Sequence, residues 1–443
     1  MPAKEVKMSE KFGTDGIRGI ANEDLTARTA FALGNALCRL KQNPKVVIGR
    51  DTRVSSDMFM LAVAAGITSG GGDVIDGGVI PTAATAFFVR KTGADFGVVI
   101  SASHNPAKFN GLKVFDERGR KLCEKAERRA EKYFDEYAFS GSLSAGRFSP
   151  LFRKEDYTDF LVSCCGVSLK GKKFALDCAN GAAGGFAAEV FERLGAKVVV
   201  CGIGRGGTDI NDGCGALHPE RVRALVKETG ADAGFSYDGD ADRLIACDEK
   251  GGLVDGDKIL CVFAQEMKSR KTLKKDIVVG TTHTNTGAEL ALTKMGVRLI
   301  RTDIGDKYVA EAMEKSGAQI GGEQSGHIIL SDYSTTGDGI LTSVKLAELI
   351  SEKRLSKLAD IKLFPQCNAS IKVKDKVRVL GDEMLREEID RAREKVARLV
   401  VRASGTEPVI RIFAEAESLK TAKNAVEQVK RSIAASEEGY SAD

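Results

Sequence analysis

The stretch KVVIGRDTRVSSDMFMLAVAAGITSGGGDVIDGGVI, residues 45–80, contains two short apolar runs separated by a longer segment of helical character. The runs KVVIG (45–49) and GDVIDGGVI (72–80) have the length and the β-branched residues of buried strands, and residues 56–69 have the length of a helix. Strand–helix–strand order is typical of a parallel, doubly wound sheet. The stretch therefore predicts an α/β fold.

This alternation continues along the chain and recurs twice. The first cycle runs on through a helix-like segment (82–91), the strand-like FGVVIS (96–101) and a second helix-like segment (122–138). The strand-like runs of the later cycles are KKFALDC (172–178), AKVVVCG (196–202) and AGFSYD (233–238), followed by KDIVVGTT (275–282), VRLIRTD (297–303) and AQIGGEQ (318–324). In each cycle a loop with Gly or Asp follows a strand, where open α/β sheets place their ligand-binding groups.

The sequence changes character after Pro365. An alternating run, a charged helix-like segment (381–398), the strand-like ARLVVRA and VIRIFAEA, and a last amphipathic segment (418–435) predict a smaller α+β domain. We expect four domains: three related α/β domains at residues 1–150, 151–250 and 251–365, and an α+β domain at residues 366–443.

The composition argues against several classes of protein. The 443 residues carry 66 Lys and Arg against 62 Asp and Glu, a net charge of +4, and the basic residues form no tract, so we expect no nucleic-acid or membrane partner. The ten cysteines show no C-x-x-C spacing, which favours reduced thiols over zinc or disulfides. No stretch approaches the roughly 18 apolar residues that span a bilayer. We expect a cytoplasmic protein.

Ser103 lies in a loop of small residues, SASHNP (101–106), directly after a strand-like run. A hydrolase serine is expected in a G-x-S-x-G turn with an acid and a histidine, and that pattern does not surround Ser103. These residues leave two interpretations open: a turn formed by Ser, Asn and Pro, or a serine with another chemistry.

The segment YDGDADR (237–243) places Asp238, Asp240 and Asp242 at alternate positions after a strand-like run. In an extended loop, three such carboxylates converge on one hard cation and leave sites for water or phosphate oxygens, as Mg²⁺ prefers. The alternative is a solvated acidic turn.

Two further loops carry binding groups. GGEQSGH (321–327) alternates Glu323, Ser325 and His327, which suit the hydroxyls of a sugar, although a polar turn is an alternative. VRASGTEPVIRI (401–412) offers the amides, hydroxyls and guanidinium groups that a phosphate needs, without the pattern of a nucleotide P-loop. With the serine and the aspartates, these loops predict phosphoryl transfer on a sugar phosphate.

The ordered motifs resemble those of the α-D-phosphohexomutase family over nearly the whole chain. They are FGTDGIRG (12–19), GRDTR (49–53), SASHNP (101–106), DCANGAAGG (177–185), NDGCGALHPE (211–220), DGDADR (238–243), GEQSGH (322–327) and RASGTEPVIR (402–411). The resemblance implies four domains around a central cleft, the last one smaller and mobile. Ala241 stands where many members have glycine, and we expect a loop conformation there that is accessible to a residue with a Cβ.

The resemblance also implies roles for single residues. Ser103 is the serine that is phosphorylated in the active enzyme, and one Mg²⁺ is bound by an oxygen of that phosphoserine with Asp238, Asp240 and Asp242. Glu323 and Ser325 hold the sugar hydroxyls. The phosphate that does not react is bound by Arg402, Ser404, Gly405, Thr406 and Arg411. The reaction centre is lined by Arg18, Lys113, Arg243 and His327, with Lys113 and His327 as candidates for proton transfer.

The implied reaction interconverts a hexose 6-phosphate and a hexose 1-phosphate through a 1,6-bisphosphate that reorients in the site. Only the resemblance, chiefly at GEQSGH and NDGCGALHPE, favours glucosamine phosphates. It implies glucosamine or glucose 1,6-bisphosphate as intermediate or activator, and a place in amino-sugar and peptidoglycan-precursor metabolism. Glucose or mannose phosphates are an alternative on the same scaffold. A non-catalytic sugar-phosphate-binding protein and a Mg²⁺-dependent phosphatase are alternatives of other classes, and a homodimer is compatible with the sequence.

Overall fold

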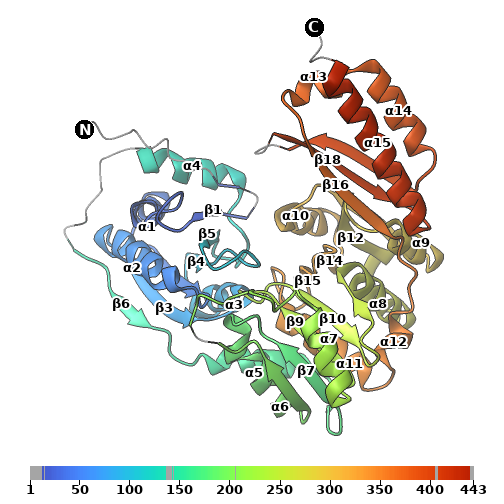
Figure 1. Ribbon diagram of the computed structural model, residues 1–443. Helices are drawn as coiled ribbons and strands as arrows, with labels where there is room; N and C mark the ends of the chain where they lie inside the picture. Colours follow the sequence, from blue (N-terminus) through green and yellow to red (C-terminus); the bar gives the residue numbers. More distant parts are fainter. Residues whose placement is uncertain are drawn as a thin grey trace. The chain divides into compact units, whose positions relative to one another are not determined.

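The computed structural model describes residues 12–13, 15–135, 142, 144–204, 206–404 and 408–439. The chain divides into two compact units (Figure 1): a first unit within residues 1–283 and 296–360, and a C-terminal unit within residues 284–295 and 361–443. The first unit is built on three α/β sheets and the C-terminal unit on an antiparallel sheet. The predicted fold class, three α/β domains and a smaller α+β domain, is confirmed.

The first sheet has six strands. In spatial order they are β1 (Ile17–Ile20), β5 (Phe109–Phe115), β4 (Phe96–Ile100), β2 (Lys45–Arg50), β3 (Asp73–Val79) and β6 (Phe148–Pro150). Alternate residues of the strands face two cores: Val98 packs with helices α1 (Ala27–Leu40), α2 (Val54–Ser69) and α4 (Glu124–Asp135), whereas Val99 packs with α3 (Thr82–Thr92). Helices on both faces match the strand–helix alternation of the sequence.

The second and third sheets repeat this plan with fewer strands. The second sheet runs β11 (Leu253–Val254), β10 (Leu244–Asp248), β9 (Ala233–Tyr237), β7 (Lys173–Asp177), β8 (Lys197–Cys201), and the third runs β13 (Arg298–Thr302), β12 (Ile277–Thr281), β14 (Ile320–Gly322), β15 (Ile328–Leu330). Their helices are α5 (Glu155–Ser163), α6 (Ala187–Arg193), α7 (Glu220–Thr229), α8 (Gly256–Ser269), α10 (Asp306–Ser316), α11 (Gly339–Ile350) and α12 (Leu355–Leu358).

The sheets are mixed rather than wholly parallel, which corrects the expectation of a parallel unit. In each α/β sheet one parallel strand turns back into an antiparallel neighbour: β4 into β5, β9 into β10, and β14 into β15. The three hairpin loops connecting these pairs are residues 101–108, 238–243 and 323–327. They hold the predicted serine, the predicted metal ligands and the predicted sugar-binding residues.

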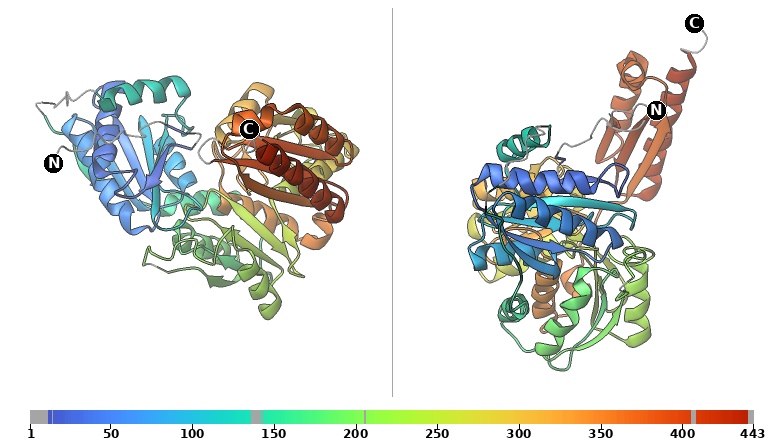
Figure 2. Two further views of the ribbon diagram at one scale, coloured as in Figure 1. Left: turned by 45° about the horizontal axis from the view of Figure 1, so that its top comes forward. Right: turned by 90° about the vertical axis from the view of Figure 1, so that its left-hand side faces the viewer.

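The C-terminal unit is a three-stranded antiparallel sheet packed against helices (Figures 1 and 2). Its strands are β16 (Gln366–Lys372), β18 (Val409–Glu415) and β17 (Arg398–Ala403), and its helices are α9 (Thr286–Lys294), α13 (Lys376–Gly381), α14 (Glu383–Arg393) and α15 (Leu419–Gly439). The predicted helix at 381–398 is shorter, because Asp382 caps a new helix by accepting the N–H groups of Met384 and Leu385.

Within the described part of the chain, every helix is too short or too polar to cross a bilayer.

Candidate active site

Contacts link the three hairpin loops of the first unit: the first loop meets the second at Ser103, and the third meets the second through His327. Ser103 is buried, and its Oγ lies 2.5 Å from Oδ2 of Asp238. These two residues are 135 positions apart in the sequence and lie in hairpin loops of different sheets. The structure thus brings together the serine and the metal loop that the sequence singled out separately.

The backbone of Ser103 lies in the left-handed region, with a φ of 53°. A residue with a Cβ is uncommon there and pays about 1 kcal/mol, and conformations of this kind concentrate at functional sites. A simple turn gives no reason for burying the hydroxyl against a carboxylate. The geometry therefore favours a chemical role for this serine.

Asp238, Asp240 and Asp242 form a buried cluster that fits a divalent cation. One carboxylate oxygen from each lies within 4.8 Å of the others, and the three residues are at most 2% exposed. Oδ1 of Asp240 and Oδ1 of Asp242 are buried without a hydrogen-bond partner among the described residues. Charged oxygen ligands in this number suit Mg²⁺, and the burial excludes a solvated acidic turn.

The charges around this cluster also favour a cation. Burial, together with the charges of Asp242 and Asp240, raises the pKa of Asp238 well above its usual value. Lys113 contacts two of these aspartates: its Nζ lies 2.8 Å from Oδ2 of Asp240 and 2.9 Å from Oδ2 of Asp242. Burial alone lowers the pKa of Lys113, but the carboxylates, led by Asp15, outweigh it and raise this pKa well above its usual value. Lys113 therefore stays charged.

Two guanidinium groups, those of Arg18 and Arg243, provide further positive charge. Nε of each is buried without a hydrogen-bond partner among the described residues. Arg18 forms an ion pair with Asp15, and the backbone N–H of Arg243 donates to Oδ1 of Asp238 at 3.1 Å. Guanidinium nitrogens with unused donors are suited to phosphoryl oxygens.

His327 is buried beside the metal loop, and it forms an isolated β-bridge with Arg243. The N–H of Gly337 donates to Nε2 at 3.1 Å, which leaves the proton of the neutral ring on Nδ1, 3.7 Å from Oδ1 of Asp242. Burial alone lowers the pKa of His327, but the carboxylates of Asp242 and Asp306 outweigh it and raise this pKa. Both ring nitrogens thus have defined neighbours.

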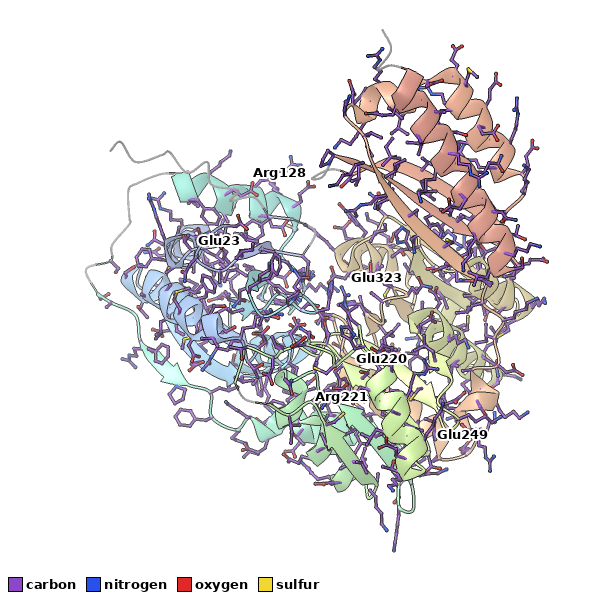
Figure 3. All side chains as sticks on the ribbon, in the orientation of Figure 1. Glu23, Arg128, Glu220, Arg221, Glu249 and Glu323 are labelled. Atoms are coloured by element: carbon purple, nitrogen blue, oxygen red, sulfur yellow. The ribbon has the colours of Figure 1, made fainter. Side chains whose placement is uncertain are left out.

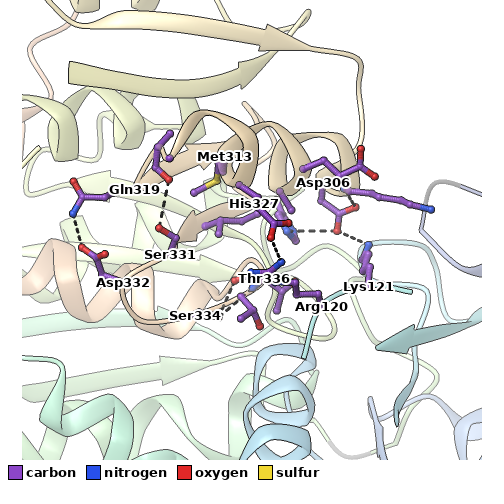
Figure 4. A pocket seen from close by; sticks show the side chains of 18 of the residues that line it. Arg120, Lys121, Asp306, Met313, Gln319, His327, Ser331, Asp332, Ser334 and Thr336 are labelled. Carbon is purple, nitrogen blue, oxygen red and sulfur yellow. Dashed lines mark hydrogen bonds and ion pairs between the residues drawn. The ribbon is translucent and has the colours of Figure 1, made fainter. Parts of the chain in front are cut away.

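Three ion-paired residues that the sequence analysis did not single out adjoin this site. Lys121 forms ion pairs with Asp15 and Asp306, and Oδ2 of Asp306 lies 3.5 Å from Nε2 of His327. Figure 4 shows Lys121, Asp306 and His327 at the wall of a cavity of about 430 Å³. A signal for Asp306 was present, since it closely follows a strand-like run, as the other site loops do.

Glu323 and Ser325 lie in the tight loop between β14 and β15. Glu323 is labelled in Figure 3. The N–H of Glu323 donates to the carbonyl of His327 at 3.0 Å and closes the loop. Oε1 of Glu323 accepts the N–H of Gly305 at 3.0 Å, and Oε2 accepts the hydroxyl of Ser325 at 3.3 Å. The carboxylate is therefore held in one orientation, and its role toward a sugar stays a prediction.

The predicted phosphate-binding residues lie in the C-terminal unit. Arg402 on β17 is directly opposite Arg411 on β18, and both are exposed. Like charges at directly opposed strand positions are unfavourable by themselves, so this pair suits a bound anion. Ser404 is buried just after β17, and Gly405 and Thr406 lie outside the described residues.

Ala241 adopts a conformation that is uncommon for a residue with a Cβ but accessible to it. Its φ is 57°, in the left-handed region that glycine adopts more easily than a residue with a Cβ. Its N–H donates to the carbonyl of Asp238 at 3.0 Å, and its carbonyl accepts the N–H of Gly339 at 2.9 Å. These two bonds hold the alanine in the conformation of a glycine and keep the loop closed around the aspartates.

The four domain models of the phosphoglucomutase/phosphomannomutase family match the chain in order. Alpha/beta/alpha domains I, II and III match residues 9–141, 155–252 and 255–364, and the C-terminal domain matches residues 347–432. The chain belongs to this family, the α-D-phosphohexomutases.

Individual proteins with similar sequences and structures give a more specific comparison within this family. The chain is 46% identical to the phosphoglucosamine mutase of Caldanaerobacter subterraneus subsp. tengcongensis, over 93% of this chain and 95% of the relative. It is 44% identical to the phosphoglucosamine mutase of Clostridium acetobutylicum, with the same coverage. Among solved structures, a phosphoglucomutase/phosphomannomutase family protein from Burkholderia thailandensis matches with a TM-score of 0.79 and 25% identity, over 97% of this chain and 98% of that one.

Proposed function

We propose that this chain interconverts glucosamine 6-phosphate and glucosamine 1-phosphate, the activity after which its 44–46% identical relatives are named. The observation that carries the proposal is this identity over more than nine-tenths of the chain. It is supported by the buried contact between Ser103 and Asp238. We place the protein in the cytoplasm, because its ten cysteines are free thiols.

We assign Asp238, Asp240 and Asp242 as the protein ligands of one Mg²⁺. When bound, this ion supplies positive charge that stabilises the transferring phosphoryl group. The proposal is supported by the buried Oδ1 atoms of Asp240 and Asp242, which have no hydrogen-bond partner in the described part of the chain. Thr82 fixes Asp240 further, since its hydroxyl donates to Oδ2 at 2.6 Å.

The reaction needs two phosphoryl transfers at Ser103. In the first, the bond between phosphorus and Oγ of Ser103 breaks and a bond to O1 of glucosamine 6-phosphate forms, while the O1 hydroxyl loses its proton and Oγ gains one. This gives the 1,6-bisphosphate. After the sugar has turned over, the bond between phosphorus and O6 breaks, the phosphoryl group returns to Oγ, and the proton passes from Oγ to O6. Glucosamine 1-phosphate then leaves with the enzyme phosphorylated as before.

We assign the cationic side chains different roles in this reaction. Lys113 has its ammonium among three carboxylates, with Asp15 Oδ2 at 3.4 Å in addition to Asp240 and Asp242, so we assign it to neutralise the cluster rather than to accept a proton. His327 is retained as the candidate for proton transfer. Arg18 and Arg243 would direct their guanidinium groups to the phosphoryl oxygens, since Nε of each has no hydrogen-bond partner among the described residues.

The remaining assignments concern the two ends of the substrate. Glu323 and Ser325 would hold the sugar hydroxyls, and Arg402, Ser404, Gly405, Thr406 and Arg411 would bind the phosphate that is not reacting. The fixed carboxylate of Glu323 and the opposed pair of Arg402 and Arg411 support these roles. Because the bisphosphate binds in two orientations, both groups of contacts must serve either end of the sugar.

The test is a direct comparison of sugars. Purified protein, activated with glucose 1,6-bisphosphate and Mg²⁺, is given glucosamine, glucose and mannose 6-phosphates in turn, and the 1-phosphates are measured by ³¹P NMR. We expect kcat/KM to be highest for glucosamine 6-phosphate and abolished in Ser103→Ala. A preference for glucose or mannose would reassign the substrate, and release of inorganic phosphate without isomerisation would indicate a phosphatase.

A further inference from the structure

The backbone of the Ser103 loop is held by two side chains from different sheets. Nη2 of Arg53, which precedes α2, donates to the carbonyls of Ser103 and Asn105 at 2.9 and 2.8 Å. Nδ2 of Asn211, from the segment between β8 and α7, donates to the same two carbonyls at 2.9 and 3.1 Å. Each carbonyl thus accepts one bond from the first sheet's side and one from the second's.

Arg53 is a rigid donor because it is itself fixed. It is 2% exposed, its Nε donates to Oδ2 of Asp51 at 2.8 Å, and its Nη1 donates to the carbonyls of Pro106 and Phe109 at 2.6 and 2.9 Å. A guanidinium with its donors arranged around one carboxylate and four carbonyls cannot shift without breaking several bonds at once.

Asp51 also fixes the other side of the serine. It accepts the hydroxyl of Ser101 at 2.7 Å, and Oγ of Ser101 in turn accepts the N–H of Ser103 at 2.8 Å. The peptide groups before and after Ser103 are therefore both held. This accounts for a residue with a Cβ remaining at a φ of 53°.

Asn211 is equally well placed. Its own φ is 60°, a conformation that asparagine tolerates, and its N–H donates to the carbonyl of Ala179 at 3.0 Å. The space beside its side chain is tightly packed. A Cβ on Gly239 would lie 2.7 Å from the carbonyl oxygen of Ser103 and 3.1 Å from Nδ2 of Asn211. The serine loop, the metal loop and the Asn211 segment pack as one block.

We propose that Arg53 and Asn211 are positioning residues for phosphoryl transfer: together they clamp the Ser103 carbonyl, hold the serine in its left-handed conformation and keep Oγ against Asp238. This inference deepens the proposed function and rests on it. Neither side chain needs to touch the substrate. The clamp acts by fixing where the phosphoryl group sits and by keeping it in a buried place.

Two consequences separate a positioning role from a merely structural one. A misplaced Oγ slows the transfer steps without weakening substrate binding, so kcat falls and KM stays nearly constant. A loosened loop also brings the Ser103 phosphate out of its buried place, where Ser103 is now 1% exposed, so water removes it faster. In a variant that had only lost stability, the molecules that remain folded would show neither change.

The experiment uses the full chain with Asn211→Gly and Asn211→Asp. Glycine accepts the φ of 60° and keeps the backbone bond to Ala179, but it removes both bonds to the serine loop. Aspartate has the same shape as asparagine and tolerates the same backbone, but it presents oxygens to the two carbonyls and repels them. Asp212→Asn, at an exposed neighbour in the same segment, is the control.

We expect Asn211→Gly to lower kcat by about 10- to 100-fold with KM changed less than about twofold, and Asn211→Asp to lower it further. The lifetime of phosphate on Ser103, loaded from glucose 1,6-bisphosphate and followed by intact-protein mass spectrometry, should shorten several-fold in both. Melting temperatures and circular dichroism report the folded fraction, and Asp212→Asn should match wild type throughout.

The proposal is overturned if Asn211→Gly retains the wild-type kcat and phosphate lifetime. It is also overturned if Asn211→Asp behaves like wild type while Asn211→Gly does not, because shape alone would then explain the effect. If Asn211→Asp does not fold, the kcat and lifetime of Asn211→Gly decide. Wild-type isomerisation tests the proposed function separately, since the phosphate lifetime judges the clamp whichever sugar the enzyme prefers.

Discussion

Asp338 gives a quantitative test of the electrostatics next to the active site. Asp338 is the N-cap of α11. Its Oδ1 accepts the N–H of Leu341 at 2.9 Å, and its Oδ2 accepts the hydroxyl of Tyr157 at 2.8 Å. These bonds favour the carboxylate, but burial outweighs them and raises the pKa of Asp338 from 3.8 to about 6. The folded protein therefore holds a proton here more tightly than the unfolded chain does.

The sign and size of the effect follow from this difference. Below pH 3.8 the group is neutral in both states and has no effect on stability, and above the folded pKa of about 6 it is charged in both. The free energy of unfolding therefore falls as the pH rises between these values, by about 3 kcal/mol for a shift of this size. Asp338→Asn removes the charge and remains a good N-cap.

We expect Asp338→Asn to be more stable than wild type by about 2 kcal/mol near neutral pH, after about 1 kcal/mol is subtracted for weaker hydrogen bonds to the amide. Near pH 4 the advantage should vanish. Urea denaturation at several pH values measures both. Asp382→Asn is the matched control, because Asp382 is a half-buried N-cap whose pKa is lowered, chiefly by its hydrogen bond from Ser436, and its substitution should cost stability above pH 4. An advantage independent of pH would refute the reasoning for Asp338.

Three further predictions concern the site. Lys113→Met removes the ammonium that neutralises the aspartates, so the free energy of unfolding in EDTA should fall by about 3 to 5 kcal/mol. Mg²⁺ should raise the melting temperature of this variant more than that of wild type. Equal shifts of the melting temperature would contradict the assignment. Gly239→Ala places a Cβ 2.7 Å from the Ser103 carbonyl oxygen and should lower kcat by about 100-fold, whereas Gly185→Ala, with nothing within 4 Å, should leave it unchanged; similar losses in both would rule out the contact. Arg402→Ala should weaken all hexose phosphates alike by roughly 2 to 3 kcal/mol in kcat/KM assays, and Glu323→Gln should discriminate among sugars; the reverse pattern would exchange the two roles.

The central strands and the loops that follow them could be predicted from the sequence, because buried parallel strands are continuous apolar runs. The antiparallel partner in the first sheet could not. FNGLKVF (109–115) carries Asn, Gly and Lys, and it is buried as β5 because Asn110 bonds to Ser55 and Ser56 and Lys113 meets carboxylates from a loop of another sheet. That compensation is tertiary and leaves no local pattern.

The same limit applies to the site residues. Ser103 and the three aspartates stand out in the sequence because each loop carries an unusual local pattern after a strand. Arg53 and Asn211 do not stand out, although both belong to the motifs quoted above, because they bind backbone carbonyls. Every residue has a backbone carbonyl, so the sequence does not show which carbonyl a given side chain will bind.

Each of the three hairpin loops is anchored at both ends in its own sheet, by the residue pairs Ile100 with Leu112, Tyr237 with Leu244, and Gly322 with Ile328. A loop closed by a strand ladder on either side has few conformations left to lose. The entropy of ordering these segments is thus lost during folding, and a ligand that arrives later does not bear it. The chain enters each catalytic cycle with its reactive loops already set, and binding energy is left for orienting the sugar.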